Sequence, residues 1–317
     1  MLLARSCRHA LSLALRPRLS HISTDARGDS STASAPAPAS ASANGEVVLT
    51  RHSGRDSGIL TLSLNRPKAR NALSRSLVAD LRHALDEIRA DSDTRVVVLR
   101  STVPGVFCAG ADLKERATMS PSDVGRFLHN LKSALSELES LPQPTIAALD
   151  GAALGGGFEL SLCCDLRIAG PRALLGLPET SLAIIPGAGG TLRLTKLIGP
   201  SQTKALVYTA RRFGPYPAMS MGIVNDVVDA AECMDEQSTL DHALGYERAL
   251  EWAREILPNG PVAVRMAKRA INHASTADPA SGLDIEQLCY AHVIPTEDRL
   301  EGLRAFKEKR KPVYKGC

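Results

Sequence analysis

Two glutamates follow glycine-containing runs and could act together in one site. Glu159 ends residues 155–159, Gly-Gly-Gly-Phe-Glu, and Glu179 ends residues 176–179, Gly-Leu-Pro-Glu. Consecutive glycines allow the backbone to approach a ligand closely, because they carry no Cβ atom. Two carboxylates in one pocket can divide the acid and base steps of a reaction between them. The pair therefore indicates a catalytic site.

Two further runs could supply backbone N–H groups to the same site. Residues 107–113, Phe-Cys-Ala-Gly-Ala-Asp-Leu, come after a strand pattern, although a plain turn explains them equally well. Residues 150–157 follow the predicted strand 145–149, and the N–H of Gly156 would stand at the positive end of a helix. Two such N–H groups aimed at one oxygen would form an oxyanion hole, which stabilises an enolate.

The elements that must position these groups alternate between strand and helix. Residues 47–49 and 59–64 predict a hairpin, and Ser74 predicts the start of a helix whose apolar residues recur at helical spacing up to Ile88. The pattern continues with strand 96–99, helix 121–141, strand 145–149 and strand 166–169. This alternation predicts the α/β class with parallel sheets up to about residue 230.

The last part of the chain has helix patterns only. They cover residues 244–256, 262–272, 283–292 and 298–309, and Pro258, Pro279 and Pro295 separate them. We therefore expect an α/β core over residues 46–237 and a C-terminal helical region over residues 238–317.

The N-terminal residues have the composition of a targeting segment. Among the first 24 of the 317 residues, four are arginine, four are serine and none is acidic, which predicts a mitochondrial presequence over residues 1–27. A disordered tail or a plastid address has a similar composition. Residues 28–45 are rich in Ser, Ala and Pro and predict a disordered linker.

Composition excludes several classes of function. Of the formal charge of +4, three units lie in residues 1–44, so the remainder has no net field that would mark a nucleic-acid binder. No apolar run is long enough to span a membrane. The seven cysteines have no C-x-x-C spacing and there is no histidine cluster, so no metal site is predicted. Leu160 stands where a dinucleotide-binding motif needs its third glycine.

Three separated motifs carry a resemblance to a known family. They are residues 107–115 (Phe-Cys-Ala-Gly-Ala-Asp-Leu-Lys-Glu), 150–159 (Asp-Gly-Ala-Ala-Leu-Gly-Gly-Gly-Phe-Glu) and 185–191 (Ile-Pro-Gly-Ala-Gly-Gly-Thr). Through them, and over residues 46–317, the chain resembles the enoyl-CoA hydratase/isomerase (crotonase) family. Residues 110–117 and 294–310 are most similar to its methylglutaconyl-CoA hydratase branch. The resemblance implies a spiral of ββα units with parallel sheets, followed by a C-terminal helical layer.

The resemblance also implies roles for individual residues. The N–H groups of Ala111 and Gly156 correspond to the family's oxyanion hole, Glu159 to the residue that activates water, and Glu179 to the acid that protonates the α-carbon. The family's substrate- and CoA-binding positions correspond to Lys68, Ala69, Arg70, Ala109, Gly110, Asp112, Leu113, Lys114, Phe306 and Lys307. No cofactor is implied, because the coenzyme A thioester is itself the substrate.

We therefore expect the protein to hydrate a short or branched 2-enoyl-CoA in the mitochondrial matrix. The leading substrate is 3-methylglutaconyl-CoA of leucine degradation, and Arg116 is a candidate partner for the second acid group of this substrate. A short-chain hydratase of fatty-acid β-oxidation and a double-bond isomerase are rivals; keeping both glutamates favours hydration. RNA binding, a rival of another class, is disfavoured because residues 86–95 carry four acidic residues against two arginines. The family likeness further implies a homohexamer, a dimer of trimers packed through the C-terminal helices.

Overall fold

The computed structural model describes residues 45–229 and 243–317. The predicted presequence, nearly all of the predicted linker and the predicted boundary between residues 237 and 238 lie outside the described residues.

The larger of two sheets has the strand order β1-β2-β3-β5-β7-β10. The predicted hairpin is confirmed: β1 (Val47–Arg51) pairs antiparallel with β2 (Ile59–Leu64), and the strands after it are all parallel. These are β3 (Val96–Ser101), β5 (Thr145–Leu149), β7 (Leu166–Ala169) and β10 (Asp226–Val227). Every residue of β2 and β5 is buried, and both strands are mainly apolar, as expected for strands with helices over both faces of the sheet.

The second sheet is small and was not anticipated as a sheet. Its order is β4-β6-β8-β9, and β4 (Val106–Cys108), β6 (Ala152–Leu154) and β8 (Leu174–Gly176) run parallel to one another. The edge strand β9 (Arg212–Phe213) pairs antiparallel with β8. Strand β4 overlaps the start of run 107–113, and β6 lies within run 150–157; the sequence patterns predicted no strand in either run.

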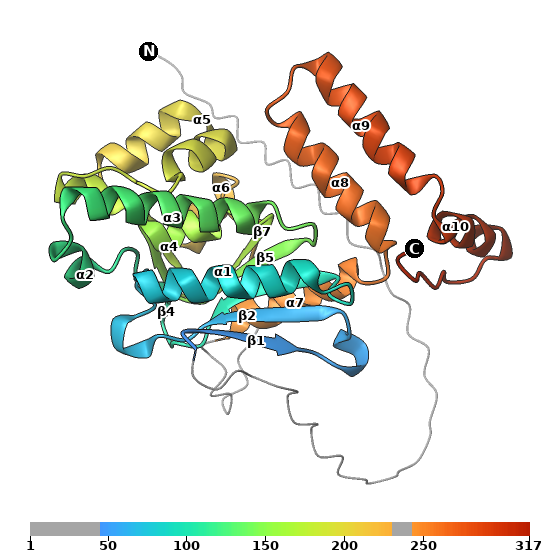
Figure 1. The fold of residues 1–317 in the computed structure, drawn as a ribbon, viewed down its shortest axis with the longest axis horizontal. Coiled ribbons are helices and arrows are strands. Elements are labelled where there is room, and N and C mark those ends of the chain that lie inside the picture. The colour runs from blue at the N-terminus through green and yellow to red at the C-terminus, as the bar shows by residue number, and fades with distance from the viewer. Residues whose placement is uncertain (1–44, 230–242) are drawn as a thin grey trace, which may run out of the picture. The chain divides into compact units, whose positions relative to one another are not determined.

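Two long helices lie side by side over one face of the larger sheet (Figure 1). The first, α1 (Arg75–Ala90), begins where predicted, because the Ser74 side chain accepts a hydrogen bond from the N–H of Leu77. The second, α3 (Pro121–Glu139), begins with a capping box of Ser120 and Asp123. Their apolar faces and the sheet form one core.

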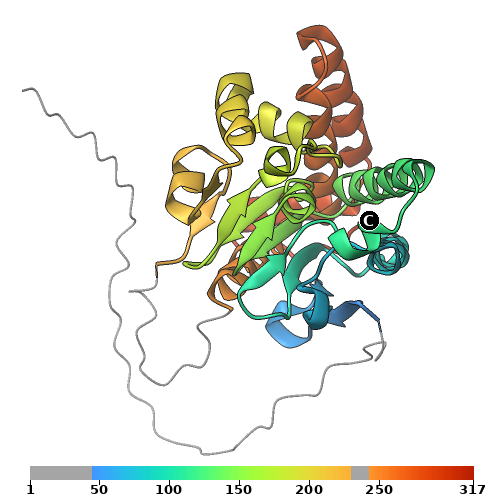
Figure 2. The same cartoon turned by 90° about the vertical axis from the view of Figure 1, so that its left-hand side faces the viewer.

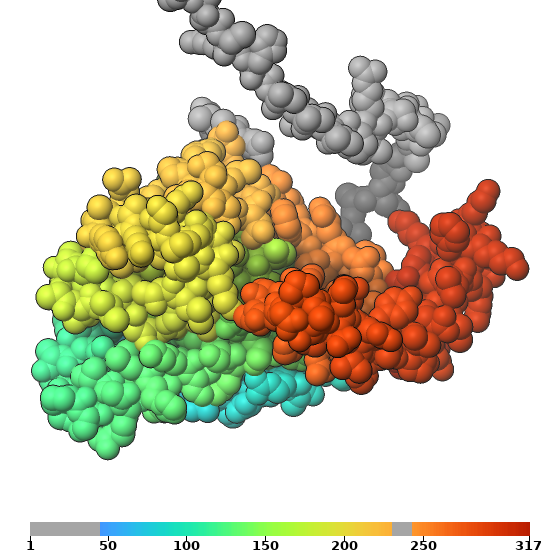
Figure 3. All heavy atoms as spheres, turned by 90° about the horizontal axis from the view of Figure 1, so that it is seen from above, coloured from blue at the N-terminus to red at the C-terminus, as the bar shows by residue number. Residues whose placement is uncertain are grey.

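Shorter elements connect these layers. They are the helices α2 (Leu113–Ala117), α4 (Gly156–Ser161), α5 (Gly190–Tyr208) and α6 (Pro215–Ser220) and the 3-10 turns η1 (Gly54–Asp56), η2 (Pro67–Ala69) and η3 (Pro178–Leu182). In the space-filling view, α3 (green) and α5 (yellow) lie against each other (Figure 3), and an ion pair between Arg193 and Glu139 joins them.

The described C-terminal residues are helical, as predicted. Helix α7 (Leu244–Ile256) packs on the opposite face of the larger sheet from α1, against a separate cluster that includes Val98, Ile146 and Ile168. Helices α8 (Pro261–Ala274) and α9 (Pro279–Val293) form a pair (Figure 2), and α10 (Glu297–Glu308) follows. Pro279 occupies the first turn of α9, so this helix starts before the predicted residue 283.

The side chain of Lys268 connects α8 to the α/β core. Lys268 is largely buried, donates to the backbone oxygen of Gln143 at 2.9 Å and forms an ion pair with Asp165 at 2.8 Å. The predicted α/β class, the parallel sheets and the C-terminal helical layer are therefore confirmed. Among the described residues, no helix is both long and apolar enough to cross a membrane.

Candidate active site

The three parallel strands of the small sheet end at one edge, and the candidate residues follow directly. Ala111 comes after β4, Gly156 and Glu159 come after β6, and Glu179 comes after β8. All four line one cavity of about 710 Å³. Carboxyl ends of parallel strands are a common place for ligand sites in α/β folds. The small sheet thus unites residues that are far apart in the sequence.

Close packing between β4 and α4 explains one glycine of the 155–157 run. A Cβ atom on Gly157 would overlap the carbonyl oxygen and Cβ of Cys108. Gly155 has a positive φ of 52°, and a Cβ atom there would lie 3.0 Å from Oε1 of Glu179. Without side chains at these two positions, the helix start lies against both β4 and the second carboxylate.

Two backbone N–H groups are free at this helix start. Neither the N–H of Ala111 nor that of Gly156 has a hydrogen-bond partner among the described residues. The two groups lie close together, since a Cβ atom built on Gly156 would be 3.7 Å from the nitrogen of Ala111. Two backbone hydrogen bonds hold the segment that carries Ala111: the N–H of Leu73 donates to the carbonyl of Gly110, and the N–H of Asp112 donates to the carbonyl of Leu73. Such a pair of fixed donors can stabilise an oxyanion.

Glu159 is buried, with 2% of its surface exposed, and is held by the backbone. Its Oε1 atom accepts hydrogen bonds from the N–H groups of Ala188 at 2.8 Å and Gly190 at 2.7 Å. Burial raises the pKa of this carboxyl group, and the two N–H donors oppose that rise. Its other oxygen, Oε2, has no hydrogen-bond donor among the described residues.

Glu179 lies in η3 and faces the same cavity. Its Oε2 atom is buried and has no hydrogen-bond partner within residues 45–229 and 243–317. Burial raises the pKa of Glu179 to about 7; its own N–H partly opposes the rise and the charge of Glu159 adds to it. Oε1 of Glu159 receives two backbone donors, whereas Oε2 of Glu179 receives none, so the two carboxyl groups are set up to differ in protonation.

Apolar residues form the walls of the cavity around these polar groups. Helix α3 contributes part of its apolar face, and η3 and the segment between η3 and α5 contribute the other apolar residues. The wall residues are Val124, Phe127, Leu128, Leu131, Leu182, Ile184, Ile185 and Pro186. Sequence periodicity marked the α3 residues only as a helix face, because helical spacing alone does not distinguish core contact from cavity lining. Ile185, 73% exposed, stands at the mouth.

The predicted CoA-binding residues fall into three groups. Ala109, Gly110 and Leu113 line the cavity. Lys68, Ala69 and Arg70 lie in and just after η2, and the Arg70 carbonyl accepts a hydrogen bond from the N–H of Ala109, so this distant segment runs beside the cavity. The others do not line it in this chain: Asp112 caps α2 and pairs with Arg66, Lys114 is exposed, and Phe306 and Lys307 lie exposed on α10. Their predicted roles stay predictions.

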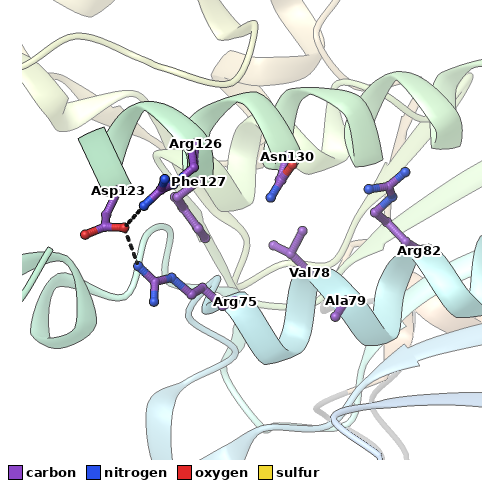
Figure 4. Close-up of a pocket in the computed structure, with 8 residues that line it drawn as sticks. All are labelled: Arg75, Val78, Ala79, Arg82, Asp123, Arg126, Phe127 and Asn130. Atoms are coloured by element: carbon purple, nitrogen blue, oxygen red, sulfur yellow. Dashed lines mark hydrogen bonds and ion pairs between the residues drawn. The ribbon is translucent and has the colours of Figure 1, made fainter. Parts of the chain in front are cut away.

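A second hollow lies between α1 and α3 and is lined by three arginines (Figure 4). Arg75 pairs with both Glu115 and Asp123, Arg126 pairs with Asp123, and Arg82 pairs with Glu137. Each of these positive charges already has a carboxylate partner, so the hollow offers no uncompensated basic surface.

The fold and the cavity define an α/β enzyme of the crotonase type. The family model for enoyl-CoA hydratase/isomerase matches residues 54–317, and the chain belongs to this family. It is 50% identical over 270 residues to "Probable enoyl-CoA hydratase 2, mitochondrial" of Arabidopsis thaliana, covering 85% of this chain and 86% of that protein. It is 48% identical over 272 residues to human "Methylglutaconyl-CoA hydratase, mitochondrial", covering 86% of this chain and 78% of that protein. The crystal structure of an enoyl-CoA hydratase from Bacillus anthracis matches with a TM-score of 0.79 and 46% identity, covering 86% of this chain and all of that one.

Proposed function

We propose that this enzyme adds water to a short or branched 2-enoyl-CoA, with 3-methylglutaconyl-CoA as the leading substrate. The observation that carries the proposal is one cavity that holds two carboxyl groups, Glu159 and Glu179, beside two free N–H groups, those of Ala111 and Gly156. Hydration of a conjugated thioester needs both kinds of group. Family membership supplies the coenzyme A thioester as the substrate class.

The N–H groups of Ala111 and Gly156 would bind the thioester carbonyl oxygen. This polarises the conjugated double bond and makes the β-carbon electrophilic. Water then forms a bond from its oxygen to the β-carbon, and the double-bond electrons move onto the thioester oxygen as an enolate. Fixed donors favour this step because they need no reorganisation when the charge develops; losing one typically lowers the rate about 10²- to 10³-fold.

The two glutamates would carry the protons. Glu159, ionised and held through Oε1, takes a proton from the water on its free oxygen. Glu179 has a pKa of about 7, so a large share of it is protonated at neutral pH, and it gives its proton to the α-carbon as the enolate collapses. Glu159 has then gained one proton and Glu179 has lost one, and proton transfer from Glu159 to Glu179 restores the starting state. The product is a 3-hydroxyacyl-CoA.

The substrate proposal rests on the relatives and on the carboxyl pair. The human relative is named for methylglutaconyl-CoA, whereas the Arabidopsis relative carries the general hydratase name. A general short-chain hydratase of β-oxidation is therefore the second candidate, and the apolar cavity walls favour it. A place in leucine degradation and in the mitochondrial matrix is part of the first proposal, supported by the mitochondrial relatives. RNA binding has less support, because the arginines on α1 and α3 are ion-paired.

Replacing each glutamate with uncharged glutamine tests the carboxyl pair. Glu159→Gln and Glu179→Gln keep the side-chain size but remove the proton-transfer group, so each should lower kcat by at least about 10²-fold. The loss of conjugated thioester absorbance measures hydration, and calorimetric titration with a saturated acyl-CoA measures binding, which should persist. Near-normal turnover in either variant would contradict the assignment.

Parallel wild-type rates separate the two substrate candidates. We expect the highest kcat/KM for 3-methylglutaconyl-CoA when it is compared with crotonyl-CoA and a longer unbranched 2-enoyl-CoA. A wide margin in favour of crotonyl-CoA would support the general short-chain hydratase instead.

A further inference from the structure

A partly buried guanidinium group in the cavity wall has one buried nitrogen whose donor is unused. Arg116 belongs to α2 and lines the same cavity as Glu159 and Glu179. Its Nη1 atom is buried and has no hydrogen-bond partner in the part of the chain that the structure describes. The group lies over the Phe127 ring, with Cζ 5.1 Å from the ring centroid. Contact with a ring face only partly replaces the water that a guanidinium loses on burial.

The carboxylates nearest to Arg116 in the sequence have other partners. Glu115 accepts a hydrogen bond from the N–H of Arg75, and its other oxygen lies 3.9 Å from Nε of that residue. Asp112 pairs with Arg66 at 2.8 Å and caps α2. Burial lowers the pKa of Arg116, and Glu115 offsets this only in part. Arginine nevertheless stays charged in proteins, so the wall contains a positive charge without a carboxylate bound to it.

Arg116 differs in this respect from the other cations of the cavity. Lys132 and Arg212 also line it, but both side chains are exposed, and water can satisfy their charges. Arg116 instead lies over the Phe127 ring, which offers no hydrogen-bond acceptor such as a carboxylate. A buried donor without a protein partner, in a residue that lines a ligand cavity, is best explained by a partner on the ligand.

We propose that Arg116 binds a carboxylate at the far end of the acyl group, so that the enzyme prefers 2-enoyl-CoA thioesters that carry a second acid group. The planar guanidinium fork matches a carboxylate and can donate two parallel hydrogen bonds. The apolar residues beside it would contact the carbon chain between that carboxylate and the thioester. This inference rests on the proposed function, which it narrows to dicarboxylic acyl groups, and it assigns the selectivity to one residue.

A matched substrate pair tests the inference. Glutaconyl-CoA is crotonyl-CoA with a carboxylate on its terminal carbon, so the ratio of their kcat/KM values isolates the second acid group. Arg116→Met keeps a side chain of similar length without charge. We expect it to lower the glutaconyl-to-crotonyl ratio about 10- to 100-fold, the range for a lost hydrogen bond to a charged group. Arg116→Lys, which keeps the charge but not the fork, should give an intermediate ratio.

Lys132→Met is the control, because it removes another positive charge from the same cavity. If only the overall charge mattered, it would change the ratio as much as Arg116→Met, and that result would overturn the proposal. An equal loss on both substrates after Arg116→Met would also overturn it, since it would assign Arg116 to the coenzyme A phosphates or to the fold.

A binding measurement keeps the test independent of catalysis. Glutaryl-CoA and butyryl-CoA have no double bond to hydrate, and they differ by the second acid group. Calorimetric titration should show tighter binding of glutaryl-CoA to the wild-type enzyme and loss of that preference in Arg116→Met. If the wild-type enzyme hydrated no enoyl-CoA, the proposed function would fail while this comparison still decided the role of Arg116. Equal wild-type affinities for the two thioesters would refute the role.

Discussion

At the scale of single residues, the two glutamates differ because of what donates to them. Oε1 of Glu159 receives two backbone N–H groups, which favour the ionised form, whereas Oε2 of Glu179 is buried without a donor. An unsatisfied buried oxygen is unfavourable for stability, yet it keeps the proton that we propose Glu179 gives to the α-carbon. A functional group of this kind should reduce the stability of the fold near neutral pH.

The raised pKa of Glu179 makes the stability of the protein depend on pH. The folded protein holds the proton up to about pH 7, whereas the usual pKa is 4.5, so the folded state binds more protons between these values. Stability should therefore fall as pH rises from about 4.5 to about 7. Glu179→Gln removes this penalty, and we expect its Tm to exceed that of the wild type at pH 8 but hardly at pH 4.5, as measured by thermal unfolding.

Glu301→Gln is a control for which we expect the opposite change in Tm. Hydrogen bonding by Arg310 lowers the pKa of Glu301 to about 2, so its stabilising contribution is present above the usual value of 4.5. This variant should lower Tm at pH 8. A Glu179→Gln variant that was less stable than the wild type at pH 8 would show that the burial of Glu179 is compensated elsewhere.

At the scale of elements, the small sheet decides whether a site exists. The strands β4, β6 and β8 are three residues each, and each delivers one part of the site at its carboxyl end. Their closeness to α4 depends on Gly157, where a Cβ atom would collide with the backbone of Cys108. Because the obstacle is backbone rather than a flexible side chain, a rotamer change cannot relieve it.

Gly157→Ala should therefore destabilise the protein and lower activity. We expect a loss of roughly 1–3 kcal/mol in the free energy of unfolding, the usual range for overpacking, measured by urea denaturation. Gly125→Ala is the matched control: this glycine lies within α3, with nothing within 4 Å of a built Cβ atom, so alanine should stabilise by up to about 1 kcal/mol. Equal effects of the two changes would rule out steric contact as the cause.

The same sheet marks the limit of prediction from the sequence. The strands at 96–99 and 145–149 were predictable because four apolar residues stand together in each, and the strand at 59–64 because leucines alternate with polar residues. Helix α1 was predictable because Ser74 and the apolar spacing agree. A strand such as Ala152–Leu154 is too short to show a period, and a glycine run follows it. The carboxyl pair was expected, but the backbone donors at Ala188 and Gly190 were not, since N–H groups leave no mark in a side-chain pattern.

At the scale of the whole molecule, apolar side chains are exposed on the C-terminal helices. Each is more than half exposed: Leu283, Leu288, Tyr290, Leu300, Leu303 and Phe306. Exposed apolar groups that gather on neighbouring elements commonly mark an interface. They lie on α9 and α10, the region that family likeness assigns to packing between subunits.

We expect the protein to sediment as a hexamer and Leu303→Glu to shift it toward smaller species, because a buried carboxylate in the interface would lack a partner. Leu192→Glu is the control: Leu192 lies on α5 and is 59% exposed, against 60% for Leu303. Analytical ultracentrifugation distinguishes the outcomes. A wild-type monomer, or an equal effect of both substitutions, would contradict packing through the C-terminal helices.

The free N–H groups of Ala111 and Gly156 belong to the main chain, and this affects how the site can be dissected genetically. No codon change deletes a main-chain donor other than one to proline, which also disturbs the backbone. An alanine scan would therefore find the glutamates and miss the groups that we propose bind the thioester oxygen. In such a scan, the two main-chain donors would be indicated only indirectly: small residues would be tolerated at position 111, whereas no substitution would be tolerated at Gly110 or Gly157. An amide-to-ester exchange in a semisynthetic protein is the substitution that removes one donor and leaves every side chain in place.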